Sequence, residues 1–243
     1  MIDRQSVRER PVGSPIMVQA WGKLLFLHWR VPANLLRPLV PAGLEIDTFD
    51  GSAWIGMTPF TMWGMRPAHL PALPVVSRSH ELNVRTYVYR DGIPGVWFLS
   101  LDASNPLAVA GARIGFHLPY FLAKMRLREA GASIGFASHR RHPGAPAAAL
   151  DVAWTRGEHL GEAKPDTLDF FLVERYCLYA GRGGRLYRAR IHHRPWPLHR
   201  AALARLSSTM LQSHGLPAPE GDPLLHAQGE PLTVGVWPLR RVR

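Results

Sequence analysis

Short runs in which apolar and polar residues alternate fill the first half of the chain. A period of two is typical of β-strands with one buried face. Strands are therefore predicted at residues 24–31, 44–49, 53–60, 81–89 and 95–101. Asp50-Gly51 and Asp91-Gly92 each separate two consecutive runs, and Asp-Gly in that position is a strong hairpin signal. We therefore expect two β-hairpins, one at each Asp-Gly pair.

The second half continues in the same style and adds two predicted helices. Residues 167–176 (TLDFFLVERY) indicate a short helix with Thr167 or Asp166 as its N-cap, and residues 201–212 indicate another helix. Further strands are predicted at residues 133–139, 150–155, 177–180, 185–192 and 232–237. Because the strands follow one another closely, antiparallel pairing is favoured. We expect one α+β domain over residues 1–243, built on a mostly antiparallel, curved or barrel-like sheet with a few helices.

Period-two alternation sorts the side chains of the predicted strands into two faces. In residues 81–89, one face carries Glu81, Asn83, Arg85, Tyr87 and Tyr89. In the next strand, one face carries Val96, Phe98, Ser100 and Asp102, and in residues 24–31 His28 and Arg30 share a face. A polar face of an antiparallel sheet normally meets solvent, but in a closed sheet it lines a cavity. In a cavity, the charged groups have to pair or bind a charged ligand, because isolated buried charges are too costly.

The chain is strongly basic, with a formal net charge of +11 and a pI near 10.7. This charge permits attraction to nucleic acid, anionic membranes or acidic ligands without selecting among them. Residues 182–194 (RGGRLYRARIHHR) would place Arg188, Arg190, His192 and Arg194 on one strand face, which is the best nucleic-acid candidate. Because no RRM, KH or helix-turn-helix signature accompanies it, a solvated strand face is the favoured interpretation.

Cys177 is the only cysteine, which suits a reducing compartment, and the charged N-terminal stretch lacks the apolar segment of a secretory signal. No apolar run approaches the length of a membrane span. We therefore expect a cytoplasmic protein without membrane association, and a homo-oligomer is compatible with the sequence.

Motifs for metals and nucleotide cofactors are missing from the sequence. Its twelve histidines include no H-E-x-x-H or Cys/His spacing, so we expect no metal site. There is no G-x-G-x-x-G after a strand, no Walker A sequence and no G-x-S-x-G elbow. We expect no cofactor.

Several segments together resemble the YqjF-like family of uncharacterised bacterial proteins, in the acetoacetate decarboxylase-like superfamily. They are FLHWRVP (26–32), LVPAGLEIDTFDGSAWIGMTPF (39–60), ELNVRTYV (81–88), GVWFLSLDA (95–103), ARIGFHLPYFLAKM (112–125), FLVERYCLY (171–179) and VGVWPL (234–239). The resemblance implies a cone-like, mostly antiparallel β-barrel around an apolar pocket. It also implies a candidate chemistry, because acetoacetate decarboxylases form a Schiff base through a lysine of depressed pKa.

The decisive departure from that pattern is at residue 120. Glu81 resembles the glutamate of the decarboxylases, and Leu118-Pro119 resembles the segment before their lysine, but the next residue is Tyr120. Tyrosine cannot form an imine. Lys124 would share a face with Tyr120 if residues 119–125 were helical, yet a lysine whose charge reaches solvent is the favoured interpretation.

These residues define a candidate site for a small organic acid or carbonyl compound. Arg85 or Arg113 would bind its anionic group, Glu81 and Asp102 would orient the arginines or act as acid and base, and Tyr120 would donate a hydrogen bond. Lys124 and His28 are weaker candidates, for catalysis and for ligand binding respectively. A lyase or isomerase step through an enolate is the expected reaction, and the alternatives are a non-catalytic binding or sensing protein and a nucleic-acid or anionic-surface binder.

Overall fold

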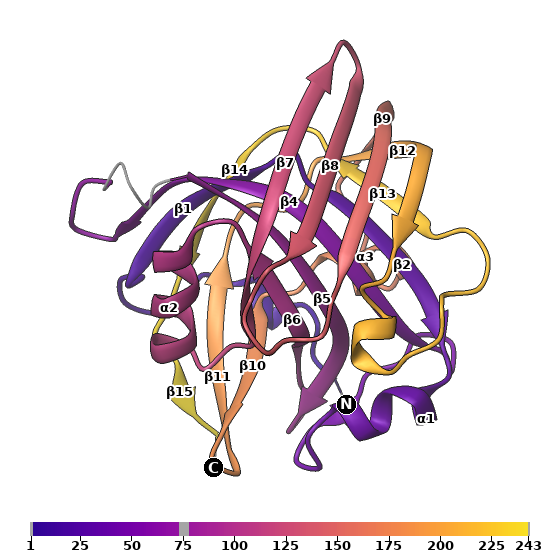
Figure 1. Cartoon of the computed structure of the whole chain (residues 1–243). Helices are drawn as coiled ribbons and strands as arrows, with labels where there is room; N and C mark the ends of the chain where they lie inside the picture. The colour runs from indigo at the N-terminus through magenta and orange to yellow at the C-terminus, as the bar shows by residue number, and fades with distance from the viewer. Residues whose placement is uncertain (1, 73–77, 243) are drawn as a thin grey trace.

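The computed structural model describes residues 2–72 and 78–242, and strands dominate it (Figure 1). The helices are α1 (Ala33–Leu36), α2 (Pro106–Gly115) and α3 (Leu168–Val173), with 3-10 turns η1 (Ser6–Arg8), η2 (Arg37–Leu39) and η3 (Gln212–His214). The strands are β1 (Met17–Gly22), β2 (Leu25–Val31), β3 (Glu45–Ile46), β4 (Ala53–Pro67), β5 (Arg78–Arg90), β6 (Ile93–Ala103), β7 (Tyr120–Ala130), β8 (Ser133–Arg140), β9 (Ala149–Gly161), β10 (Cys177–Arg182), β11 (Arg185–His192), β12 (Leu198–Ser208), β13 (Leu224–Gln228), β14 (Leu232–Val236) and β15 (Arg240–Arg241).

All the strands belong to one mixed sheet that closes on itself through hydrogen bonds. Pairings from β4 through β1, β14, β11, β10, β6 and β5 return to β4 and form a first ring. Pairings from β4 through β2, β13, β12, β9, β8, β7, β6 and β5 form a second ring. Only the β6–β10 and β6–β7 pairings are parallel among the described strands, which confirms the mostly antiparallel α+β prediction.

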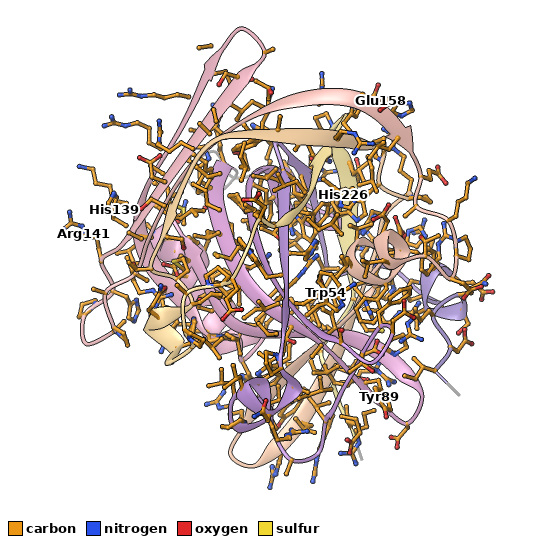
Figure 2. The ribbon with its side chains drawn as sticks, turned by 90° about the vertical axis from the view of Figure 1, so that its right-hand side faces the viewer. Trp54, Tyr89, His139, Arg141, Glu158 and His226 are labelled. Atoms are coloured by element: carbon orange, nitrogen blue, oxygen red, sulfur yellow. The ribbon has the colours of Figure 1, made fainter. Side chains whose placement is uncertain are left out.

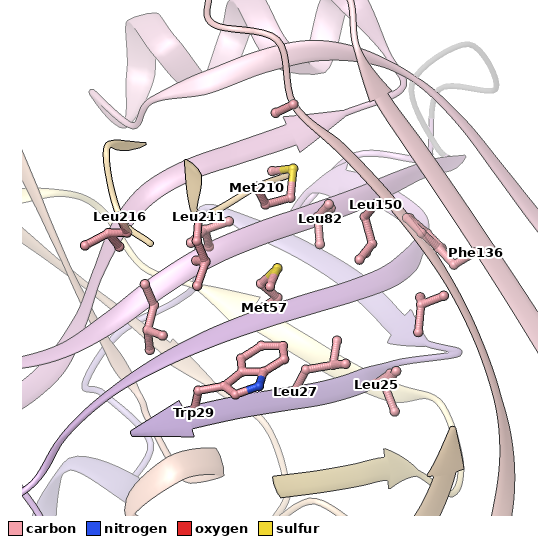
Figure 3. Packing of buried hydrophobic residues seen from close by; sticks show 14 of the residues in the cluster. Leu25, Leu27, Trp29, Met57, Leu82, Phe136, Leu150, Met210, Leu211 and Leu216 are labelled. Carbon is pink, nitrogen blue, oxygen red and sulfur yellow. The ribbon is translucent and has the colours of Figure 1, made fainter. Parts of the chain in front are cut away.

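The main hydrophobic core fills the second ring (Figure 3). It includes Leu27 from β2, Met57 from β4, Leu82 from β5 and Leu150 from β9, each at most 1% exposed. Because side chains alternate along a strand, the neighbours of these residues on β4 and β5 point into the first ring instead. The shared strands β4, β5 and β6 thus separate a dry core from the interior of the first ring.

Both Asp-Gly turns form as predicted, although one of them joins strands differently. Asp50 and Gly51 have φ angles of 48° and 74°, and Asp91 and Gly92 have 52° and 74°, the left-handed values of a type I′ hairpin turn. The second turn joins the paired strands β5 and β6. The first turn is flanked only by an isolated bridge between Phe49 and Ser52, and the preceding strand β3 pairs with β5 rather than with β4.

The predicted helix at residues 201–212 is wrong, because residues 201–208 belong to strand β12, which pairs with β9 on one side and β13 on the other. The register against β9 shifts between Leu203 and Arg205. This bulge lets both Leu203 and Leu206 pack against the main core. Two apolar residues three positions apart gave a helix-like spacing, and the Ala- and Leu-rich composition reinforced it.

Residues 106–125 also differ from expectation. Helix α2 was not predicted, although Pro106 at its first position and the Asn105 side chain, which accepts from the backbone of Leu107 and Ala108, are helix-start signals. Residues 119–125, which would place Lys124 and Tyr120 on one face if they were helical, are not helical, because strand β7 begins at Tyr120. The short helix α3 does start as predicted, with the Thr167 side chain accepting from the backbone of Phe170.

No helix in the described part of the chain is long and apolar enough to cross a membrane.

Candidate functional site

A cavity of about 320 Å³ lies inside the first ring, with α2 forming part of its wall. Most lining side chains are apolar or aromatic, including Phe60 from β4, Phe98 from β6 and Trp196. On α2, the small residues Gly111 and Ala112 face the cavity. A concave, mostly apolar pocket with a few polar groups is the usual form of a small-molecule site.

The polar face of β5 lines this cavity rather than meeting solvent. Glu81, Asn83 and Arg85 all contribute to the lining, whereas Leu82 and Val84 point the other way into the main core. Glu81 is 3% exposed and Asn83 is 5% exposed. The closure of the first ring therefore decides between the two interpretations that the sequence left open.

Glu81, which is buried, and Tyr120, which is half-buried, form a hydrogen-bonded pair in the cavity lining. The Tyr120 hydroxyl donates to Glu81 Oε2 at 2.9 Å. Burial is the main cause that raises the pKa of Glu81 to about 8. The hydrogen bond from Tyr120 acts in the opposite direction and lowers this pKa, and the charge of Asp102 raises it. Burial, together with the Glu81 charge and hydrogen bond, raises the pKa of Tyr120 well above its usual value. At neutral pH the pair is therefore uncharged and able to exchange protons with a ligand.

Arg85 brings a positive charge into the same cavity. Its Nη2 donates to the Leu172 carbonyl at 3.3 Å, and its guanidinium lies 5.4 Å from the Phe26 ring centroid and 5.9 Å from that of Tyr87. Within the described residues, no carboxylate forms an ion pair with it, and its buried Nε has no hydrogen-bond partner. A guanidinium in apolar surroundings with donors to spare is suited to a carboxylate.

Arg175, which sequence reasoning missed, lines the cavity near Arg85. Its Nη1 donates to Asp47 at 2.8 Å and its Nε to the Phe171 carbonyl, while Nη2 has no partner among the described residues. Asp47 also pairs with Arg4. The only available signal was an arginine inside the apolar segment 171–179, and its partner Asp47 lies 128 positions away in the sequence.

Other cavity side chains also have buried polar atoms without a hydrogen-bond partner among the described residues. These atoms are Gln19 Oε1, Thr58 Oγ1, Asn83 Oδ1 and Trp21 Nε1. Each of these atoms has almost no accessible surface, so its side chain has to move before a ligand in the cavity can reach it. The accessible surface of the cavity is therefore mostly apolar.

Asp102 does not point into the cavity, contrary to the face assigned from its sequence. In β6 the register against β5 shifts, so that Val84 pairs with Ser100 but Arg85 pairs with Phe98. This bulge leaves Leu99 extra and reverses the alternation, so that Leu101 rather than Asp102 lines the cavity. Asp102 instead accepts hydrogen bonds from Arg140 Nε and Nη2, the latter at 2.7 Å, in a fully buried ion pair.

His28 and Arg113 both lie outside the cavity lining. The buried His28 ring hydrogen-bonds to the Tyr87 hydroxyl at 2.8 Å, and that hydroxyl donates to the Leu172 carbonyl. Burial lowers the pKa of His28 well below its usual value, which keeps the ring neutral. Arg113 is an exposed residue of α2 whose Nη1 donates to the Tyr120 carbonyl at 2.6 Å, so it holds the backbone that carries Tyr120.

None of the three lysines lines the cavity among the described residues. Lys124 is exposed on β7, in the hairpin with β8 that projects from the body of the molecule (Figure 1). Lys23 pairs with Glu129 at 2.6 Å, and Lys164 lies in the loop before α3. An imine-forming amine is therefore not part of the cavity wall.

The arginine-rich hairpin is partly covered by the N-terminal segment. Arg190 Nη2 donates to the carbonyls of Val7 and Glu9. The histidines are scattered, with His139 on the outside of the molecule near Arg141 and His226 inside the fold (Figure 2). Over the described residues, no three His, Cys, Asp or Glu side chains come together as a metal site would need.

Comparison with known proteins identifies a family match and a curated relative. The model of the DUF2071 family, described as uncharacterized conserved proteins, matches residues 18–230. The chain is 44% identical over 231 residues to the uncharacterized protein YqjF of Bacillus subtilis (strain 168), covering 95% of this chain and 94% of that protein.

Solved structures with acetoacetate decarboxylase-like folds are similar at low sequence identity. The enduracididine biosynthesis enzyme MppR in complex with pyruvate aligns over 96% of this chain and 93% of its own, with a TM-score of 0.63 and 14% identity. An acetoacetate decarboxylase-like enzyme from Sphingomonas wittichii RW1 aligns over 95% and 94%, with a TM-score of 0.62 and 12% identity. The acetoacetate decarboxylase of Legionella pneumophila aligns over 97% and 91%, with a TM-score of 0.60 and 13% identity. At these identities the likeness establishes the fold and not the reaction.

Proposed function

The chain belongs to the DUF2071 family, and on that premise we propose that it binds a small organic acid or carbonyl compound in the cavity of the first ring and acts on it as a lyase or isomerase. The reaction proceeds without a Schiff base, because none of the lysines of the described residues lines the cavity, and because Tyr120 stands where the resemblance to the decarboxylases would place their lysine.

The observation that carries the proposal is the pairing of two unlike groups in one apolar cavity. Arg85 supplies a cation without a carboxylate partner, and Glu81 with Tyr120 supplies a proton-transfer pair. One structure of the similar protein MppR contains pyruvate, and a second structure of MppR holds the condensation product of pyruvate and imidazole 4-carboxaldehyde. In this chain, Arg85 suits a carboxylate and Tyr120 suits a carbonyl, so the proposed ligand carries both groups.

The pair can carry out an enolate step with the groups present. With the ligand bound, the Tyr120 hydroxyl donates to the carbonyl oxygen of the ligand instead of to Glu81. Most Glu81 is protonated at neutral pH, and the ionised fraction grows as the pH rises toward its pKa of about 8. In that ionised fraction, Glu81 removes the proton from the carbon next to the carbonyl, and the C–H electron pair forms the enolate that Tyr120 stabilises. In a ligand with a β,γ double bond, return of the proton from Glu81 to the γ-carbon completes an isomerisation. In a ligand with a β-substituent, the enolate electrons form the α,β double bond while the substituent leaves with the electrons of its bond to the β-carbon and takes the proton from Glu81, which completes a lyase reaction. A pKa of about 8 suits Glu81 to this role, because a base works best with a pKa near the operating pH.

Binding is tested with a panel of oxo acids by titration calorimetry on the whole protein. Arg85→Ala should weaken binding by about tenfold or more, since a charge-assisted hydrogen bond contributes about 1.5–3 kcal/mol. Arg128→Ala is the matched control, because Arg128 is an exposed arginine of β7 outside the cavity. An unchanged dissociation constant in Arg85→Ala would remove Arg85 from the proposal.

Catalysis is tested by proton exchange in heavy water, followed by NMR of the ligand. Wild-type protein should exchange the protons next to the carbonyl, and Glu81→Gln should bind the ligand without exchanging them. Borohydride added to the complex should leave all three lysines unmodified in peptide mass spectra. Binding without exchange by the wild type would instead identify a non-catalytic binding or sensing protein.

A further inference from the structure

We infer that the ligand is an elongated oxo acid, in which a carboxylate and the reacting carbonyl are separated by an apolar spacer of several carbon–carbon bonds. This inference rests on the proposed function, because it uses Arg85 and the Glu81–Tyr120 pair as the two contact points. It goes further by excluding short α-oxo acids, whose carboxylate and carbonyl are adjacent, as good substrates.

The two contact points are far apart along β5. Glu81 and Arg85 lie four residues apart on one strand face, with Asn83 between them. At about 3.3 Å per residue, their Cα atoms are separated by about 13 Å. Even if each side chain extended along the strand toward the other by the length of one residue, about 3.3 Å, a distance of about 7 Å would remain between the two functional groups. At ~1.5 Å per bond, an extended ligand needs about five carbon–carbon bonds to cover that distance.

The contacts of each group hold the two ends apart. At one end, the Arg85 guanidinium donates to the carbonyl of Leu172, a residue of α3, and lies against the rings of Phe26 and Tyr87. At the other end, Tyr120 starts β7, which pairs in parallel with β6 at Leu101. The Arg85 contacts thus lie toward α3 and the Tyr120 contacts toward β7 and α2.

The charges of the two ends fix the direction in which an anion binds. Arg85 and Arg175 both contact the Tyr87 ring, and Arg175 and Arg4 share the carboxylate of Asp47, so the three arginines and Asp47 together have a net formal charge of about +2. Near Tyr120, Arg140 neutralises Asp102 and Glu81 is mostly protonated at neutral pH, while the Arg113 guanidinium that binds the Tyr120 carbonyl is exposed to solvent and outside the cavity lining. Because solvent screens the charge of Arg113, a carboxylate in the cavity is attracted more strongly to the Arg85 end than to the Tyr120 end.

Aromatic side chains lie beside both contact points, because Phe60 pairs with Glu81 on the β4–β5 ladder and Phe98 pairs with Arg85 on the β5–β6 ladder. Between them, Asn83 pairs with Thr58 and with Leu101, and the cavity lining as a whole is mostly apolar. The volume of about 320 Å³ corresponds to roughly ten water molecules at ~30 Å³ each, so a three-carbon acid would leave much of the cavity unfilled. An extended chain buries this apolar wall and contacts both polar ends at once.

Positional isomers of one oxo acid test the inference most sharply. Calorimetry compares 6-oxoheptanoate with 2-oxoheptanoate, which has the same atoms but adjacent carboxylate and carbonyl, and with pyruvate. Wild-type protein should bind 6-oxoheptanoate about tenfold more tightly than its isomer, because only the longer spacing lets the carbonyl accept from Tyr120. Tyr120→Phe should remove this preference, whereas Arg85→Ala should weaken both isomers.

The outcomes separate this inference from the proposal on which it rests. If both isomers bind equally, depend on Arg85 and lose equally in Tyr120→Phe, the elongated ligand is refuted while the proposed function stands. If neither isomer depends on Arg85, the proposed function fails and the inference fails with it. The isomer comparison on wild-type protein alone decides the spacing even if Tyr120→Phe does not fold.

Discussion

Burial of Glu81 predicts a stability that falls as the pH rises. Glu81 is 3% exposed, and burial raises its pKa from 4.5 to about 8. Below pH 4.5 the carboxyl is protonated in both states and contributes no pH dependence. Between about pH 4.5 and 8, the unfolded chain releases this proton and the folded protein keeps it, so rising pH favours unfolding.

The magnitude follows from the width of that window. A span of about 3.5 pH units at about 1.4 kcal/mol per unit lowers the free energy of unfolding by about 5 kcal/mol above pH 8. Glu81→Gln removes the ionisation but keeps an oxygen that accepts from the Tyr120 hydroxyl. The variant should match the wild type within about 1 kcal/mol at pH 4.5 and exceed its stability by about 5 kcal/mol at pH 9.

Urea unfolding followed by tryptophan fluorescence measures the effect between pH 4.5 and 9. Because every other titrating group is shared, the difference between the two proteins at each pH isolates Glu81. Glu158→Gln is the control for removal of a carboxyl group, since the Glu158 side chain is 70% exposed and its exposed ion pair with Arg200 should contribute less than about 1 kcal/mol. Parallel stability curves for wild type and Glu81→Gln would refute the buried, protonated carboxyl.

Two further predictions concern buried groups that hold the cavity walls. Arg140→Met leaves the Asp102 carboxylate buried without its partner and should lower the free energy of unfolding by about 3–5 kcal/mol in urea titrations, whereas Arg205→Met, in an exposed ion pair, should cost less than about 1 kcal/mol. Tyr87→Phe removes the hydroxyl that donates to the Leu172 carbonyl and should cost about 1–3 kcal/mol in the same titration, and an unchanged midpoint would contradict that hydrogen bond.

Local signals in the sequence predicted the elements whose causes are themselves local. The Asp91-Gly92 turn adopts left-handed backbone angles that these residues tolerate, and Thr167 caps α3 through its own side chain. Glu81, Asn83 and Arg85 also share one face of β5, as their period-two alternation predicted. These features depend on neighbouring residues, so a single sequence contains the information for them.

Features that depend on distant strands could not be predicted in this way. Whether the polar face of β5 meets solvent or a cavity depends on the closing pairings β1–β14 and β6–β10, which involve residues more than 80 positions apart. The role of Arg175 likewise depends on Asp47, which is distant in sequence. The strand β12 forms because its neighbours on both sides supply hydrogen bonds, and this overrides its helix-favouring composition.

The bulge at Leu99 has the greatest consequence for the chemistry of the cavity. Without it, strict alternation from Phe98 would point Asp102 into the cavity beside Glu81 and turn Leu101 away. Two carboxyl groups would then share the Tyr120 end. With the bulge, Asp102 faces Arg140, and Glu81 is the one carboxyl in the cavity lining that the structure describes. A single protonated carboxyl leaves the cationic end uncompensated, and this asymmetry gives an anionic ligand one favourable orientation, with its carboxylate at Arg85 and its reacting end at Tyr120.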